Sequence, residues 1–175
     1  IRNIKDNDTV PINVTGEICI RGYCNMLAYN DNAVATSQTI DASGWLHTGD
    51  IGSMDSRGYL RVTGRLKDMI IRGGENLFPA EIENRLLEHS QIMEVAVLGV
   101  SDKKWGEVVV AFIRYSCEAP KVDELVAFCR ERLSPQKTPK YWVFLDEWPL
   151  TGSGKIQKFA LRERFEAGGF AVVSR

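Results

Sequence analysis

The sequence has no long apolar run, no signal peptide and no excess of charge of either sign. No segment is long enough and apolar enough to span a bilayer, and the chain does not open with a secretory leader. Its formal net charge is −1, so no basic field favours binding to nucleic acid or anionic lipid. We therefore expect a protein with no membrane span and no nucleic-acid partner.

The chain has four cysteines, but none of the spacings that are typical of zinc or redox motifs. They are Cys19, Cys24, Cys117 and Cys129. Thiols without such a motif are most often reduced and buried, and reduced thiols suit a reducing compartment. We therefore expect mostly buried free thiols, no metal site, and a cytoplasmic protein, with the mitochondrial matrix as the alternative location.

The chain also lacks an initiating methionine, because residue 1 is Ile. A length of 175 residues can hold one ordinary domain, or a small domain and part of another. We expect that the sequence is cut from a longer protein, and a missing targeting signal is then uninformative about location.

Residues 1–63 have the pattern of strands and turns. In the segment TGEICIRG, Ile18 and Ile20 alternate with polar residues between two glycines, which predicts a half-buried strand. The segment GYLRVTGR repeats this pattern, and DASGWLHTGDIG between the two is too rich in glycine and aspartate for a helix. Because this part is short and dominated by strands, we expect residues 1–66 to be the β-rich end of a larger domain.

From residue 67 onward, helices and strands are mixed. The segment RLKDMIIRGGENLF favours two short strands joined by a glycine turn, and EVAVLGV and EVVVAFIRY favour buried strands. Pro79 is expected to begin a helix, KVDELVAFCRERLS to form an amphipathic helix, and SGKIQKFALRERF to form the last helix. The apolar stripe expected on this last helix is Ile156, Phe159, Ala160 and Phe165. We therefore expect an α+β fold, in which residues 67–175 form a small domain with a short sheet and flanking helices.

Three short segments carry residues that suit chemistry. TGSGKIQK places Lys155 after two glycines and before a helix, as a mobile point charge on a turn. HTGD places Asp50 in a glycine-flanked turn, where a carboxylate can accept hydrogen bonds from the two hydroxyls of a ribose. IRGGENLFP contains the adjacent Gly73 and Gly74. Each segment also has an ordinary interpretation, namely a solvated lysine, a capping aspartate and a plain hairpin turn.

Taken together and in this order, the three segments resemble a known family. GWLHTGD, GRLKDMIIRGGENLFPAEIE and PLTGSGKIQK are similar to the C-terminal motifs of the adenylate-forming superfamily. That superfamily includes acyl-CoA synthetases, aryl-CoA ligases, luciferases and the adenylation domains of peptide synthetases. The resemblance covers residues 15–166 and is closest to the fatty and medium-chain acyl-CoA synthetases. It implies a small, mobile C-terminal lid domain, residues 67–175, preceded by the β-rich end of a large AMP-binding domain, residues 1–66.

The resemblance also implies a reaction in two halves. A carboxylate attacks the α-phosphate of Mg²⁺-bound ATP to give acyl-AMP and pyrophosphate, and a thiol, usually that of CoA, then attacks the acyl-adenylate. By this resemblance, Lys155 approaches the carboxylate and the α-phosphate, where its charge offsets the charge on the phosphoryl oxygens. Asp50 binds the ribose hydroxyls, and Arg65 contacts ribose or phosphate. Lys67 matches the hinge between the two lid orientations.

For the second half-reaction, the resemblance points to four residues. Gly73 and Gly74 match the loop that makes room for the pantetheine arm of CoA. Trp105 matches a position where some relatives pack an aromatic ring against CoA, and Lys140 matches a basic position near the CoA phosphates. Gln136 stands where the family often has an aromatic residue. Core packing for Trp105 and simple solvation for Lys140 are the alternatives.

The family's Ser/Thr/Gly-rich phosphate loop and its acyl pocket lie upstream of the motifs found here. We therefore expect this chain alone to be inactive and to work with the missing N-terminal domain. The expected ligands are ATP, Mg²⁺, CoA and a carboxylic acid, with a fatty acid as the first choice. An aryl-acid ligase or a peptide-synthetase adenylation domain is a rival with the same chemistry. A truncated, non-catalytic binding module is a rival of another class.

Overall fold

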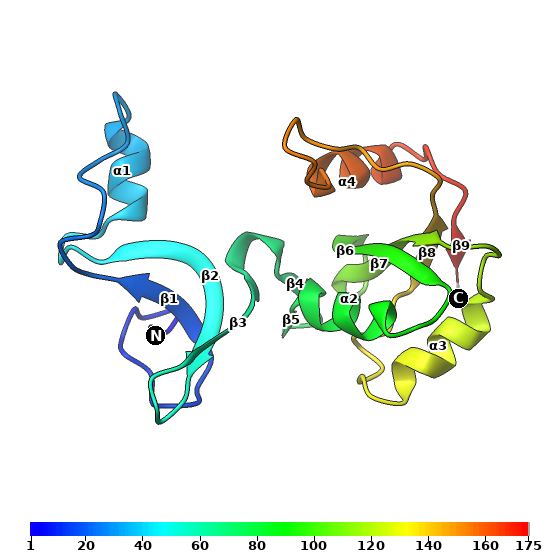
Figure 1. Cartoon of the computed structure of the whole chain (residues 1–175), viewed down its shortest axis with the longest axis horizontal. Coiled ribbons are helices and arrows are strands. Elements are labelled where there is room, and N and C mark those ends of the chain that lie inside the picture. The colour runs from blue at the N-terminus through cyan, green and yellow to red at the C-terminus, as the bar shows by residue number, and fades with distance from the viewer. Residues whose placement is uncertain (175) are drawn as a thin grey trace. The chain divides into compact units, whose positions relative to one another are not determined.

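The computed structural model describes residues 1–174, and in it the chain forms two compact units (Figure 1). The first unit is Ile1–Lys67, and the second begins at Asp68. The division falls directly after Lys67, the residue for which the family resemblance implies a hinge. Compactness carries no information about motion, so the hinge role stays a prediction. No helix among residues 1–174 is long and apolar enough to cross a bilayer.

The first unit is built on a three-stranded antiparallel sheet in the order β1-β2-β3. Its strands are β1 (Gly16–Ile20), β2 (Leu46–Met54) and β3 (Leu60–Arg65). Ile18 and Ile51 are its buried aliphatic side chains, whereas the large side chains of Tyr23 and Leu27 are almost fully exposed. A core of this size is small for an independently stable domain.

A short helix, α1 (Ala33–Thr39), was not expected in the first unit. It is capped by Asn32, whose side-chain oxygen accepts a hydrogen bond from Ala35 N at 2.9 Å. None of its residues is buried, so the sequence carries no apolar stripe that could indicate a helix. The expectation of strands and turns alone over residues 1–63 is therefore wrong.

Strand β1 lies where the alternation placed it, but two of its side chains have the opposite environment. Glu17 is only 8% exposed, whereas Ile20 is 49% exposed. Glu17 can be buried because its carboxylate is hydrogen-bonded to His47 and to Gly49 N. The pattern of apolar residues therefore located the strand without identifying its buried acid.

The second unit is a six-stranded sheet with helices on both faces (Figure 1). The strand order is β5-β4-β7-β8-β9, and β6 pairs with β7. The strands are β4 (Ile70–Arg72), β5 (Glu75–Leu77), β6 (Ile92–Asp102), β7 (Gly106–Tyr115), β8 (Tyr141–Phe144) and β9 (Val173–Ser174). The helices are α2 (Pro79–Leu87), α3 (Val122–Arg130) and α4 (Lys158–Glu166). The expected α+β class is confirmed.

The two faces of this sheet carry separate apolar cores. One core joins side chains of α2 and α3, such as Leu86 and Leu125, to Val97 and Trp142 of the sheet. The other core joins Leu161 of α4 to sheet residues that point the opposite way. Successive side chains of β6 and β7 alternate between the two cores, which explains why their sequences are almost continuously apolar.

The apolar stripe expected on the last helix is wrong in part. Helix α4 begins at Lys158, so Ile156 precedes it. Its buried side chain is Leu161, which the stripe omitted, whereas Phe159 is 63% exposed. Phe165, four residues after Leu161, packs against the same core. The predicted helix began before Lys158, and this error moved the predicted buried face away from Leu161.

The cysteines are also less buried than expected. All four are free, but Cys129 alone is buried, Cys19 is half-buried, and Cys24 and Cys117 are exposed. Burial raises the pKa of the Cys129 thiol to about 11. Cys24 and Cys117 lie in segments outside the helices and strands, where no packed face covers them.

Candidate functional site

Asp50 lies on a bulge of strand β2. In the pairing of β1 with β2, Glu17 faces Ile51 and Cys19 faces His47, so Ile18 stands opposite residues 48–50. A bulge of this kind re-aims side chains and is common beside functional sites. Gly49 has a φ of +72°, a left-handed conformation that glycine adopts without strain. The bulge therefore interrupts the β1–β2 ladder at the residues around Asp50.

Asp50 is paired with Arg65 across the sheet. The two residues are partners in the β2–β3 register, and Arg65 Nε lies 2.9 Å from Asp50 Oδ1. The Arg65 side chain is 55% exposed and the Asp50 side chain is 32% exposed, so both stay accessible to a ligand. The structure thus brings together the two residues that the family resemblance implies for the nucleotide. Ribose binding itself stays a prediction.

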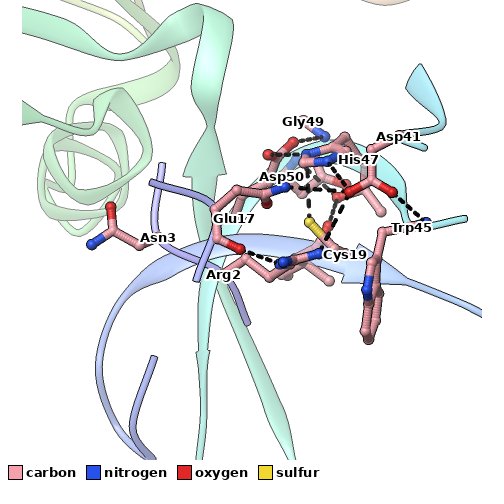
Figure 2. A network of polar contacts seen from close by, with 12 residues as sticks. Arg2, Asn3, Glu17, Cys19, Asp41, Trp45, His47, Gly49 and Asp50 are labelled. Atoms are coloured by element: carbon pink, nitrogen blue, oxygen red, sulfur yellow. Dashed lines mark hydrogen bonds and ion pairs between the residues drawn. The ribbon is translucent and has the colours of Figure 1, made fainter. Parts of the chain in front are cut away.

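A network of polar side chains lies behind the bulge (Figure 2). His47 Nδ1 and Glu17 Oε2 are 2.7 Å apart, and because a carboxylate can only accept, the proton of this bond lies on Nδ1. Glu17 Oε1 accepts a hydrogen bond from Gly49 N at 3.0 Å. On the other side of the imidazole, His47 Nε2 lies 3.6 Å from Asp41 Oδ2. Arg2 Nη1 is 3.5 Å from the same Asp41 oxygen.

Backbone hydrogen bonds hold Asp41 in this network. Its carboxylate accepts hydrogen bonds from Trp45 N and Ser43 N, and these bonds hold the pKa of Asp41 below its usual range. Arg2 and Arg21 lie over the ring of Trp45, with guanidinium carbons 5.2 and 4.6 Å from its centroid. The loop before β2 is therefore held by hydrogen bonds to Asp41 and by two guanidinium groups at Trp45.

Glu17, Cys19 and His47 also form the one group of metal-ligand types that the described residues bring together, with ligand atoms within 4.8 Å of one another. A zinc ion bound at about 2.0 Å would hold tetrahedral N and O ligands about 3.3 Å apart. The 2.7 Å separation of His47 Nδ1 and Glu17 Oε2 is that of a hydrogen bond. Burial raises the pKa of the Cys19 thiol to about 11, and the charge of Glu17 adds to the shift. These contacts fit a hydrogen-bond network.

Lys155 lies on an exposed turn of the second unit. Thr151 N donates to Lys155 O at 2.8 Å, and Lys155 N donates back to Thr151 Oγ1 at 3.0 Å. Gly154 has a φ of +79°, which the turn requires. The Lys155 side chain is exposed and forms no ion pair with the acidic side chains of residues 1–174. Its ammonium group is therefore free to meet a ligand.

The base of the Lys155 turn is anchored to the second unit. Gln157 Nε2 donates to Leu150 O at 2.8 Å, which closes the turn. Lys158, the first residue of α4, donates to Glu83 Oε1 at 2.7 Å and to Val97 O at 3.1 Å. Glu83 Oε1 in turn accepts from Val97 N at 2.8 Å. The turn is thus tied to both α2 and β6.

The residues implied for CoA lie around one turn, residues 102–105. Gly73 N donates to Trp105 O at 2.8 Å, and a Cβ on Gly73 would stand 3.0 Å from the Trp105 ring. Lys140 Nζ donates to Asp102 Oδ2 at 2.7 Å. Trp105 is 43% exposed, so it is not a core residue. Gly73, Trp105 and Lys140 therefore share one surface of the second unit, and Gly74 adjoins it.

Asp102 organises this surface, and no sequence motif had singled it out. Its Oδ1 accepts hydrogen bonds from Lys104 N and Trp105 N at 2.9 and 3.0 Å. The bond from Lys140 is the main cause that lowers the pKa of Asp102 to about 2, and the same bond raises the pKa of Lys140. Lys140 is therefore a paired cation. The alternative of simple solvation does not describe Lys140, and its role toward CoA stays a prediction.

The remaining predicted residue, Lys67, is exposed and lies in a short 3-10 turn, Leu66–Asp68. Asp50 and Arg65 belong to the first unit, and Lys155, Gly73, Gly74, Trp105 and Lys140 to the second. Sequence patterns missed Glu17, His47 and Asp102, because the contacts that give them a role join residues far apart in the chain.

Comparisons with known proteins show what this chain is similar to. Residues 81–155 match the family described as AMP-binding enzyme C-terminal domain. The chain is 47% identical over 167 residues to a mitochondrial medium-chain acyl-CoA ligase, ACSF2, of Rattus norvegicus, covering 95% of this chain and 27% of that protein. The chain thus spans about a quarter of the length of this curated relative.

Solved structures agree with this relationship. The o-succinylbenzoate CoA synthetase MenE from Bacillus subtilis, in complex with an acyl-adenylate, is 36% identical with a TM-score of 0.83. That match covers 94% of this chain and 33% of MenE. A Mycobacterium tuberculosis fatty acyl CoA synthetase is 40% identical with a TM-score of 0.65, covering 88% of this chain and 30% of that one.

Proposed function

Because this chain belongs to the adenylate-forming superfamily, as part of its C-terminal portion, we propose that it works within a longer acid–CoA ligase. In this proposal the whole enzyme converts a carboxylic acid and ATP to acyl-AMP and pyrophosphate, and then transfers the acyl group to CoA. The observation that carries the proposal is the 47% identity to an acyl-CoA ligase along 95% of this chain.

For the first half-reaction, we assign the nucleotide to Asp50 and Arg65 and the reacting groups to Lys155. Asp50 has a partly exposed carboxylate that suits two ribose hydroxyls, and Arg65 beside it suits a ribose or phosphate oxygen. Lys155 presents an unpaired ammonium group on a fixed turn, as is needed to offset charge on the carboxylate and the α-phosphate. Mg²⁺ would accompany ATP, and we assign no residue of this chain to it.

For the second half-reaction, we assign CoA to the surface around residues 102–105. Gly74 borders open space that suits the pantetheine arm, and Gly73 beside it makes room for the Trp105 ring. Trp105 offers a partly exposed ring, and Lys140 offers a positive charge. Lys67 lies at the junction of the two compact units, in keeping with a hinge between two orientations of the second unit.

The substrate is proposed to be a medium- or long-chain fatty acid, supported by the names of two relatives, a medium-chain acyl-CoA ligase and a fatty acyl CoA synthetase. An aryl acid is the second candidate, because MenE, an o-succinylbenzoate ligase, matches with a TM-score of 0.83. The mitochondrial relative supports the mitochondrial matrix as one of the two proposed locations, the other being the cytoplasm.

ATP–pyrophosphate exchange by a full-length enzyme carrying this chain tests the proposal. A panel of short, medium and long fatty acids is compared with benzoate-type acids, and CoA consumption is measured in parallel. We expect exchange with fatty acids and none from the isolated chain. Exchange restricted to aryl acids would favour the second substrate class. A peptide synthetase would show exchange with amino acids, and a non-catalytic binding module would show no exchange with any acid.

A further inference from the structure

The hydrogen bonds around the bulge of β2 suggest a role for Glu17 that the reaction scheme does not contain. Where β2 bulges, residues 48–50 leave the regular ladder with β1. Their amide groups then need other acceptors. Glu17 Oε1 accepts from Gly49 N at 3.0 Å, and Thr48 Oγ1 accepts from Asp50 N at 3.0 Å. Two side chains thus accept the hydrogen bonds of the amides of Gly49 and Asp50 in place of the β1 backbone.

Both of these side chains are themselves fixed. Glu17 is 8% exposed, and its second oxygen is 2.7 Å from His47 Nδ1 (Figure 2). Thr48 Oγ1 donates to Ile18 O at 2.7 Å, so the hydroxyl cannot turn away from Asp50 N. The bulge is therefore held by a buried carboxylate of strand β1 and by a hydroxyl that is bonded to the backbone of that strand.

We propose that Glu17, held by His47, is a positioning residue for nucleotide binding, because it fixes the bulge that aims the Asp50 carboxylate at the ribose. This inference rests on the proposed function of Asp50. Glu17 touches no ligand in this scheme and acts through the Gly49 amide. A ribose is recognised through two hydroxyls at once, so a small rotation of Asp50 weakens both bonds. Loss of Glu17 therefore weakens the recognition of ribose hydroxyls specifically.

A group of metal ligands is the other interpretation of these residues. Glu17, Cys19 and His47 have the right donor atoms, but the 2.7 Å contact and the Gly49 amide both occupy the Glu17 carboxylate. A carboxylate used in this way orients the backbone, so positioning is the interpretation that uses every observed bond. It also gives a reason for burying an acidic residue in so small a core.

The test compares ATP with 2′-deoxy-ATP in the pyrophosphate exchange of a full-length enzyme carrying this chain. The readout is the ratio of kcat/KM for the two nucleotides, which reports on hydroxyl recognition and not on folding. We expect Asp50→Ala to abolish the preference for ATP, and Glu17→Ala to lower it by about tenfold, as expected for one charge-assisted hydrogen bond. Glu17→Gln retains an oxygen for the Gly49 amide, so it should restore most of the preference.

Three further variants make the test specific. Thr48→Val removes the hydroxyl that accepts the hydrogen bond from Asp50 N, so it should lower the same ratio. This variant takes the place of Glu17→Ala if Glu17→Ala fails to fold. Cys19→Ser changes a side chain 3.6 Å from His47 Nδ1 that makes no bond to the bulge, so it should leave the ratio unchanged. The double variant Glu17→Ala/Asp50→Ala should be no worse than Asp50→Ala, because the two residues act through one contact.

Each outcome of these experiments either supports or overturns the positioning role of Glu17. A normal ratio in Glu17→Ala and Thr48→Val, with the preference lost in Asp50→Ala, would overturn the positioning role and leave the proposed function intact. A normal ratio in Asp50→Ala would remove the ribose anchor and the positioning role together. A shifted ratio in Cys19→Ser, or a zinc-dependent ratio that chelator treatment reverses in the wild type, would also overturn the inference.

Discussion

The Asp102 carboxylate accepts a hydrogen bond from Lys140 Nζ at 2.7 Å, across 38 residues of sequence. The same carboxylate holds the backbone of the turn that carries Trp105. One acidic side chain therefore sets the position of two residues that we assign to CoA. In the full-length enzyme we expect Asp102→Ala to raise the KM for CoA by about tenfold, the effect of losing a charged hydrogen bond, with acyl-AMP formation nearly unchanged. An equal loss in both half-reactions would argue for a general structural defect.

The same pair gives a pH dependence. The pKa of Asp102 is lowered to about 2, so the carboxylate stabilises the fold above the unfolded-state pKa of about 3.9, and this contribution is lost as the pH falls toward 2. We expect Asp102→Asn to lower the melting temperature of the chain at neutral pH, and the difference from the wild type to shrink between pH 4 and pH 2. A constant difference across that range would contradict the ion pair.

Lys155 gives the most direct test of the first half-reaction. Lys155→Ala in the full-length enzyme should slow acyl-AMP formation by about two to three orders of magnitude, as is typical for the loss of one preorganised donor. Thioester formation from supplied acyl-AMP should change much less. Lys121→Ala is the matched control, because Lys121 is also an exposed lysine but lies at the start of α3. Equal slowing of both half-reactions would contradict the assignment.

The sequence predicted the parts of the fold that depend on local patterns. The apolar runs located β6 and β7, and Pro79 marked the first residue of α2. Helix α1 was not predicted, because it buries no residue and so has no apolar stripe in its sequence. The buried face of α4 was predicted incorrectly because the helix was expected to begin before Lys158. Where this helix begins depends on the preceding turn, which the apolar periodicity does not reveal.

In the candidate site, too, local motifs predicted some residues and could not predict others. Short motifs singled out Asp50 and Lys155. The structure places Lys155 on the expected turn, whereas Asp50 lies on a bulge within strand β2 and not in the turn that its motif predicted. The residues that support them could not be predicted, because their partners are remote in sequence. Glu17 meets His47 across 30 residues, and Lys158 meets Glu83 across 75. No periodicity connects such pairs, and only the folded sheet brings them together.

Gly74 tests the loop that we assign to the pantetheine arm. Gly74→Leu should suppress thioester formation and spare acyl-AMP formation, because a Cβ there meets open space that CoA would occupy. The φ of +85° also strains any other residue by about 1–2 kcal/mol. Gly168→Leu controls for this strain, since Gly168 has a φ of +73° and equally open surroundings. A matching defect in both variants would show that strain alone is responsible.

The last prediction concerns Lys67, at the junction of the two compact units. Proline at this position fixes φ and disfavours a helical backbone at Leu66, the first residue of the 3-10 turn. If a few dihedral angles here change between the two half-reactions, Lys67→Pro restricts that change. We expect the full-length variant to keep most acyl-AMP formation and to lose most thioester formation, measured separately with supplied acyl-AMP.

Lys67→Ala is the control for this prediction, because it removes the exposed side chain and leaves the backbone free. It should affect both half-reactions mildly. Circular dichroism of the isolated chain shows whether proline unfolds the second unit, whose first strand, β4 (Ile70–Arg72), follows the turn. In a folded Lys67→Pro variant, the informative quantity is the ratio of the two half-reaction rates relative to the wild type. A ratio unchanged within error would refute the hinge, because a fixed φ at the pivot must alter the exchange between two orientations.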